Sequence, residues 1–110
     1  MTQLPKTYLN IRERHPAFIA AVETLGTATK EAGPLDEKTA QLIQLAGAVA
    51  IHSEGSVRSH AKRAREAGAT PEEIAHAIIL LTSTIGFPTV AAALSWIEAD
   101  VSPPWVSECG

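Results

Sequence analysis

The side chains best suited to chemistry gather in residues 52–60, HSEGSVRSH. The imidazole of His60 changes charge near neutral pH, and a partly desolvated carboxylate such as that of Glu54 can share a proton with it. Such a pair can donate and accept protons during a reaction. The sequence therefore predicts acid/base chemistry on a small molecule, with His60 and Glu54 as candidate catalytic residues.

A helix over residues 53–67 would place these side chains beside an apolar face. At about 100° per residue, Ser53, Ser56 and His60 lie on one edge of the face that is centred on Val57. Ser56 is therefore a third candidate catalytic residue, and Ser53 is a candidate for binding substrate. Two plainer interpretations stay open, because a serine at a helix start commonly acts as the N-cap and a histidine at such an edge is commonly a hydrogen-bonded packing residue.

Glu54 falls on the other flank of the same face. We expect its carboxylate to lean inward near the helix N-terminus, where first-turn N–H groups could also hold an anionic group. Arg58, one turn later, is a candidate substrate-binding residue that would steer a carboxylate of the substrate.

Metal and sulfur chemistry have little support in the sequence. The four histidines, at positions 15, 52, 60 and 76, include no pair spaced i, i+4. The single cysteine, Cys109, leaves no CxxC pair and no internal disulfide. We expect neither a metal nor an organic cofactor.

Charge and hydropathy argue against some classes of partner and indicate where the protein is located. Nine Lys and Arg against twelve Asp and Glu give a net charge of −3, which argues against a broad surface for nucleic acid or an anionic membrane. No apolar run approaches the roughly 18 residues of a membrane span, and the N-terminus lacks the apolar segment of a signal peptide. We expect a cytoplasmic protein whose partners are a small-molecule substrate and other copies of itself.

The apolar spacing, nearer 3.6 than 2 residues, predicts an all-α chain. The expected helices, bounded by Gly, Pro and capping signals, cover residues 16–30, 36–52, 53–67, 70–86 and 89–100. Residues 1–14 form a lead-in, and residues 101–110, with Trp105, form a non-helical tail. The clearest start is TPEE at 70–73, a capping box with Pro at the first helical position. Gly68 is expected in the left-handed conformation that ends the preceding helix.

The helix that starts at Thr70 is apolar on two sides. One side carries Ile74, Ile78, Leu81 and Ile85, and the other carries Ile79 and Leu80. A helix of this kind needs two partners, and in a domain this small we expect the second partner to be another subunit. A central helix wrapped by its own neighbours is the alternative that stays open.

Three stretches of the sequence form a distinctive pattern through their order and spacing. They are LDEKTAQLIQLAGAVA at 35–50, EGSVRSHAKRAREAGATPEEIAHAIILL at 54–81 and GFPTVAAAL at 86–94. His60 is followed eight residues later by the turn GATPEEI, and a Gly-x-Pro begins at residue 86. In these features residues 35–97 resemble the carboxymuconolactone decarboxylase and alkylhydroperoxidase D-like family. The length of 110 residues favours a single domain over residues 1–110. The resemblance implies that this domain is an alkylhydroperoxidase D-like bundle of about five to six helices, and that it assembles as a homo-oligomer, either a trimer or a hexamer.

In the peroxidase branch of the family that this sequence resembles, the motif is C-x-x-C followed by His, and a Glu one helix earlier passes protons to the thiols. Aligned on His60, the two cysteine positions fall on Ser53 and Ser56, and the Glu position falls on Gln41. Serine forms no disulfide, and Cys109 alone does not replace the pair. Peroxide reduction of the alkylhydroperoxidase or peroxiredoxin type is therefore the disfavoured alternative, and Gln41 is a candidate substrate-binding residue.

The decarboxylase branch isomerises and decarboxylates a small lactone acid by proton transfer, without a metal or an organic cofactor. His60 and Glu54 are compatible with that chemistry, although Thr84 stands where Tyr is common and Ser56 where an acidic residue is frequent. The resemblance thus implies a cofactor-free lyase or isomerase that acts on a small organic acid or lactone. A non-catalytic oligomeric binding module is the remaining alternative.

Overall fold

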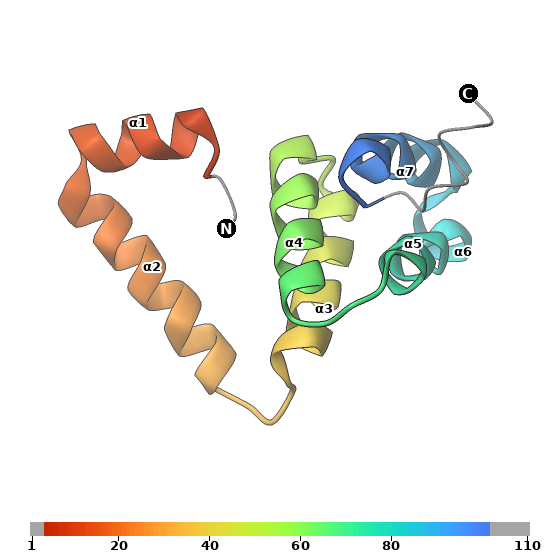
Figure 1. Cartoon of the computed structure of the whole chain (residues 1–110), viewed down its shortest axis with the longest axis horizontal. Coiled ribbons are helices and arrows are strands. Elements are labelled where there is room, and N and C mark those ends of the chain that lie inside the picture. The colour runs from red at the N-terminus through yellow and green to blue at the C-terminus, as the bar shows by residue number, and fades with distance from the viewer. Residues whose placement is uncertain (1–3, 102–110) are drawn as a thin grey trace. The chain divides into compact units, whose positions relative to one another are not determined.

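The computed structural model describes residues 4–101 of the chain, with side chains described through Glu98. In that part all regular structure is helical, which confirms the all-α prediction (Figure 1). The helices are α1 (Lys6–Arg14), α2 (Pro16–Glu31), α3 (Glu37–Ala50), α4 (Glu54–Glu66), α5 (Pro71–Ile79), α6 (Thr82–Ile85) and α7 (Phe87–Val101). Trp105 and Cys109 lie outside the described residues.

The chain divides at Asp36 into two compact units. The first unit pairs α1 with α2, and α2 begins at Pro16, where the missing N–H of proline costs nothing. The Tyr8 hydroxyl donates a hydrogen bond to the Glu23 carboxylate, and the Arg12 guanidinium lies 5.8 Å from the centre of the Tyr8 ring. The helix expected from residue 16 is thus confirmed, and the expected lead-in contains a helix of its own.

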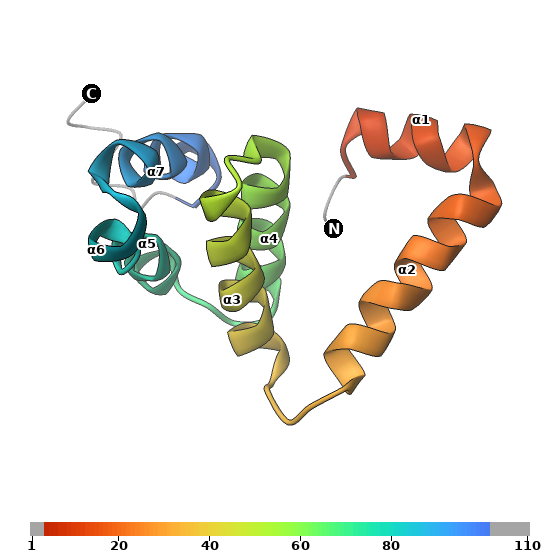
Figure 2. The same ribbon diagram turned by 180° about the vertical axis from the view of Figure 1, so that it is seen from behind.

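The second unit, from Glu37 onward, holds the hydrophobic core. Helices α3 and α4 lie side by side, α7 packs against α4, and α5 packs against both α3 and α7 (Figures 1 and 2). The buried face of α4 is made of one valine and two alanines, and such small side chains let neighbouring helices approach closely. The core residues are Leu45, Ala48, Val49, Val57, Ala61, Ala64, Ala69, Ile74, Ile78, Val90, Ala93 and Ile97.

A tight turn joins α3 to α4. The His52 N–H donates to the Val49 carbonyl and the Ser53 N–H donates to the Ala48 carbonyl, both at 3.0 Å, which is the hydrogen-bond pair of a Schellman motif. His52 takes the left-handed backbone conformation that this motif needs, with a φ of 59°. The helix expected to end near His52 therefore ends as the sequence predicts, and the chain reverses direction within three residues.

The turn from α4 to α5 confirms the clearest local prediction. Gly68 has a φ of 103° at the end of α4. The Thr70 hydroxyl accepts from the Glu73 N–H at 3.0 Å, and Glu73 Oε1 accepts from the Thr70 N–H at 2.9 Å, so the capping box is complete. Pro71 occupies the first turn of α5, as expected.

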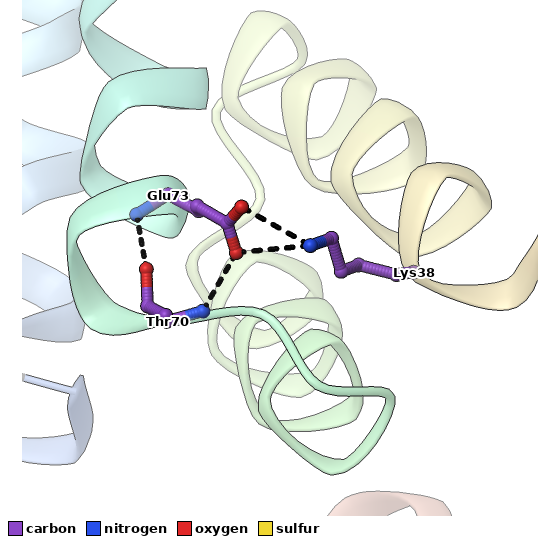
Figure 3. Close-up of polar contacts among 3 residues, drawn as sticks. All are labelled: Lys38, Thr70 and Glu73. Atoms are coloured by element: carbon purple, nitrogen blue, oxygen red, sulfur yellow. Dashed lines mark hydrogen bonds and ion pairs between the residues drawn. The ribbon is translucent and has the colours of Figure 1, made fainter.

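The capping glutamate also links α5 to α3 (Figure 3). Lys38 Nζ donates to both carboxylate oxygens of Glu73, at 3.2 and 3.1 Å. The Thr70 N–H, and after it the Lys38 ammonium, hold the pKa of the Glu73 carboxyl below its ordinary value. A single carboxylate therefore caps one helix and pairs with the first turn of another.

The prediction of one helix from Thr70 to residue 86 is wrong in length, because α5 ends at Ile79 and the short α6 begins at Thr82. The Thr82 hydroxyl donates to the Ile79 carbonyl at 2.7 Å. The backbone also tightens here, since the Leu81 N–H donates to the Ile78 carbonyl, three residues back, at 3.0 Å. Gly86, with a φ of 96°, then separates α6 from α7, where the sequence predicts a break.

The two-sided apolar pattern of this region survives the break. Leu81 and Ile85 pack against the core. Ile79 and Leu80 face outward and are 49% and 61% exposed. The pattern predicted from the helical wheel is therefore confirmed, although two short helices and not one long helix produce it.

Candidate functional site

The turn between α3 and α4 brings Gln41 opposite His60. Gln41 lies seven residues before Ala48, and His60 lies seven residues after Ser53, the two residues that the turn joins by a hydrogen bond. Seven residues are close to two helical turns, or about 10 Å along the axis. Both side chains therefore return to the face where the helices meet, at matching distances from the turn.

Gln41 and His60 make a direct hydrogen bond across this interface. His60 Nδ1 lies 2.8 Å from Gln41 Oε1, and Gln41 Nε2 donates to Glu37 Oε2 at 2.7 Å. Gln41 is only 1% exposed and is the one polar side chain that is buried within residues 4–98. Glu37 lies one turn earlier on α3, on the surface. The three side chains form a hydrogen-bonded chain from the surface to the imidazole, which we call the Glu37–Gln41–His60 chain.

The partners in this chain determine the direction of each hydrogen bond. A carboxylate only accepts hydrogen bonds, so the Glu37 carboxylate must bind the NH2 end of the Gln41 amide. The oxygen of that amide then faces His60 and must accept from Nδ1–H. In the neutral ring Nε2 consequently carries the lone pair, and in the charged ring it carries a proton. Nε2 can take up or release a proton while the Gln41 contact stays the same.

Glu54 does not lie where the helical wheel predicts. Its carboxylate accepts from Arg58 Nε at 3.0 Å and from the Arg58 NH2 group at 2.8 Å, and its side chain is 49% exposed. The expectation that Glu54 leans inward beside His60 is therefore wrong. Burying a carboxylate costs several kcal/mol, whereas an arginine one turn later offers it a charged partner at the surface.

Arg58 is engaged by the same ion pair, and its side chain is 41% exposed. Its expected role, steering a substrate carboxylate, would require exchange of the Glu54 carboxylate for that of the substrate. The structure thus brings Glu54 and Arg58 together with each other, and brings His60 together with Gln41.

Ser53 and Ser56 are both partly buried, as is His60. Ser53 occupies the N-cap position of α4, but within the described chain its side chain makes no capping hydrogen bond. The plainer interpretation of Ser53 as a capping hydroxyl is therefore wrong. Its backbone serves the turn instead, through its N–H bond to Ala48.

Two further polar residues of α3 belong to this region. Glu37 lies in the first turn of the helix, and in the sequence only its spacing of one helical turn from Gln41 indicates their contact. Gln44 has a buried Oε1 atom that lacks a hydrogen-bond partner among the described residues. A buried acceptor without a partner is uncommon in folded proteins.

Among the described side chains, residues 4–98, no three His, Cys, Asp or Glu side chains converge closely enough to hold a metal ion. None of the helices in the same part of the chain has the length and apolarity that crossing a membrane requires.

Comparison with known proteins assigns the chain to a family. A Haemophilus influenzae protein described as uncharacterized is 35% identical over 63 residues, which cover 57% of this chain and 56% of that protein. The match thus spans a little over half the length of that relative. No solved structure gives a significant match. The profile of the Carboxymuconolactone decarboxylase family matches residues 16–99, three quarters of the sequence, and the chain belongs to this family.

Proposed function

We propose that this protein is a cofactor-free lyase or isomerase that acts on a small organic acid or lactone, with His60 as its general acid and base. The hydrogen bond between His60 Nδ1 and the buried Gln41 amide supports this proposal most directly. A histidine held at one ring nitrogen by a buried partner keeps the other nitrogen in a defined direction, which proton transfer requires.

The reaction class needs only one such group. In a decarboxylation, the C–C bond to a carboxylate breaks, CO2 leaves, and the bonding electron pair stays on the carbon skeleton. The skeleton then takes up a proton, which His60 Nε2–H can deliver, and the neutral imidazole is recharged from water. In an isomerisation, Nε2 removes a proton from one carbon and returns it to another. Neither path needs an electron acceptor.

The other candidate site residues take narrower roles in this proposal. Ser56, one turn before His60 on α4, is the nearest candidate for a hydroxyl that contacts the substrate, with Ser53 beside the turn. Arg58 and Glu54 form a surface ion pair, from which Arg58 could be recruited by a substrate carboxylate. Gln41 belongs beneath His60, because both ends of its amide are already bound.

The test compares two histidines. His60→Gln should lower turnover of γ-carboxymuconolactone or a related unsaturated lactone acid by about 10² to 10⁴-fold, the usual contribution of a positioned acid or base. His76→Gln changes an exposed histidine on α5 and should leave turnover at the wild-type rate. If His60→Gln reacts as fast as the wild type, or if the wild type turns over no such acid, the proposal is wrong.

Peroxide reduction is tested in the same preparation. The thiol positions implied by the family resemblance hold Ser53 and Ser56, and the remaining thiol is Cys109. We expect no thiol-dependent reduction of hydroperoxides. Peroxide reduction that disappears in Cys109→Ser would instead support the peroxidase alternative.

We also propose that the chain works as a homo-oligomer, a trimer or a hexamer. Large apolar side chains are exposed in the second unit, among them Ile79, Leu80 and Phe87, at 49%, 61% and 65%. Exposed apolar residues in such number are typical of surfaces that meet another subunit. The mass of the assembly, measured by light scattering, tests this part of the proposal.

A further inference from the structure

We infer that Glu37 is a positioning residue that acts on His60 through Gln41 and selects which imidazole nitrogen carries the proton. This inference rests on the proposed function, because it gives Glu37 a role in the same proton-transfer site. It concerns an exposed carboxylate that lies two hydrogen bonds away from the imidazole.

The orientation of the Gln41 amide decides the direction of the hydrogen bonds in the Glu37–Gln41–His60 chain. Its two ends have nearly the same shape, so that the buried side chain could present either its oxygen or its NH2 group to His60. At 1% exposure, the side chain is closed to bulk solvent. The Glu37 carboxylate, 2.7 Å from Gln41 Nε2, can only accept, and it therefore favours the orientation that presents the amide oxygen to His60.

Replacement of Glu37 by a hydrogen-bond donor would reverse the direction of both hydrogen bonds in the Glu37–Gln41–His60 chain. With a donor in place of the carboxylate, the Gln41 oxygen would turn toward position 37, and its NH2 group would face His60. Nδ1 would then have to accept, and the neutral ring would carry its proton on Nε2. That tautomer has no lone pair at the nitrogen that the proposed reaction uses as a base.

A purely structural role for Glu37 makes a different prediction. Glu37 also lies in the first turn of α3, where any acidic side chain interacts favourably with the helix dipole. Loss of that interaction would lower stability slightly but would leave the imidazole tautomer unchanged. The tautomer of His60 therefore separates the two roles, whereas stability does not.

The experiment reads the His60 tautomer from the ¹⁵N chemical shifts of its ring nitrogens in the full chain without substrate. The pH is set to about 9, well above the ordinary histidine pKa of about 6.5. The variants are Glu37→Gln, which keeps the shape of the side chain, Glu37→Lys, which replaces an acceptor by a donor, and Gln41→Met, which removes the amide. Glu66→Gln, a loss of the same charge from the exposed end of α4, is the matched control.

We expect the wild type and Glu66→Gln to hold the Nδ1–H tautomer in about ten-fold excess or more, since a hydrogen bond to a charged group changes an equilibrium by at least that factor. Glu37→Gln should lower this ratio to that of Gln41→Met, and Glu37→Lys should favour Nε2–H. A ratio in Glu37→Gln and Glu37→Lys equal to that of the wild type would overturn the inference, as would a wild type that is mainly Nε2–H. Because no substrate is present, a failure of the proposed reaction leaves this result readable, and a failure here leaves the turnover test intact.

Discussion

Gly68, with a positive φ, and Gly47, with a helical backbone, should respond in opposite ways to substitution by alanine. Gly68 ends α4 with a φ of 103°, and a Cβ atom added there would meet nothing within 4 Å. Gly47 lies on the exposed surface of α3, in ordinary helical conformation, and a Cβ atom added there would also meet nothing within 4 Å. Packing is thus the same at both sites, and only the backbone differs.

The magnitudes follow from that difference. A left-handed conformation costs a residue with a side chain roughly 1–2 kcal/mol, and the smaller entropy of the unfolded chain returns about 0.4–1 kcal/mol of it. Gly68→Ala should therefore lower the free energy of unfolding by about 1 kcal/mol. Gly47→Ala should raise it by about 0.5–1 kcal/mol, the usual gain inside a helix. His52, with its φ of 59°, is the reverse case. His52→Gly should raise the free energy of unfolding by about 0.5–1 kcal/mol.

Urea unfolding followed by far-UV circular dichroism measures all three variants. With a slope of about 1–3 kcal/mol per molar urea for a small protein, the two alanine variants should have midpoints on opposite sides of the wild type. If Gly68→Ala and Gly47→Ala shift the midpoint in the same direction, the positive φ is not the reason for glycine at position 68. If His52→Gly is destabilising, the positive φ of His52 does not cost the folded chain the free energy expected of it.

Four further outcomes follow from the structure. Thr70→Ala removes one arm of the capping box and should lower the free energy of unfolding by about 1 kcal/mol, with Thr70→Ser close to wild type in urea titrations. The pKa of the Glu73 carboxyl is lowered in the folded chain, so its contribution to stability is complete above its ordinary pKa of about 4.3 and is lost as the pH falls through the folded value. In Glu73→Gln the free energy of unfolding should therefore depend less on pH over that acid range. An unchanged pH dependence would contradict the cause given for the lowered pKa. Gln44→Met removes a buried acceptor that has no partner among the described residues and should leave stability equal or higher, whereas a loss above about 1 kcal/mol would indicate a partner in the assembly. Aspartate at both Ile79 and Leu80 should lower the mass of the assembly in light scattering, and an unchanged mass would place the contact between subunits elsewhere.

The features that could be predicted from sequence are those whose cause is local. The capping box at Thr70, the proline that follows it and the left-handed Gly68 each depend on hydrogen bonds or backbone angles within a few residues. Apolar periodicity likewise identified the outward-facing Ile79 and Leu80, because the turn between α5 and α6 keeps the chain close to helical geometry.

The features that could not be predicted depend on competition between partners. A helical wheel places Glu54 at the flank of the buried face but does not say whether protein or water covers that flank, and the charged partner at Arg58 favours the surface. The break after Ile79 coincides with a hydrogen bond from the Leu81 N–H to the Ile78 carbonyl, three residues back, and apolar periodicity does not show such a change in backbone spacing. The sequence places His60 at the edge of the buried face, but its partner Gln41 comes from another helix, and the sequence alone does not show that contact.

Three positions of this chain differ together from the peroxidase pattern that the family resemblance implies, and the geometry explains why they belong together. A glutamate at position 41 would share the interface with His60, and it could pass protons to thiols at positions 53 and 56. With serines at those positions there is no thiol to receive a proton, and an amide at position 41 neither stores nor delivers one. What a buried glutamine can still do is hold an imidazole in one orientation, provided that something holds the glutamine. Glu37, one turn away, supplies that hold at 2.7 Å. In the proposed function, Gln41 therefore supports His60 at the position where the resemblance implies a proton-donating Glu, and the histidine is the proposed acid and base.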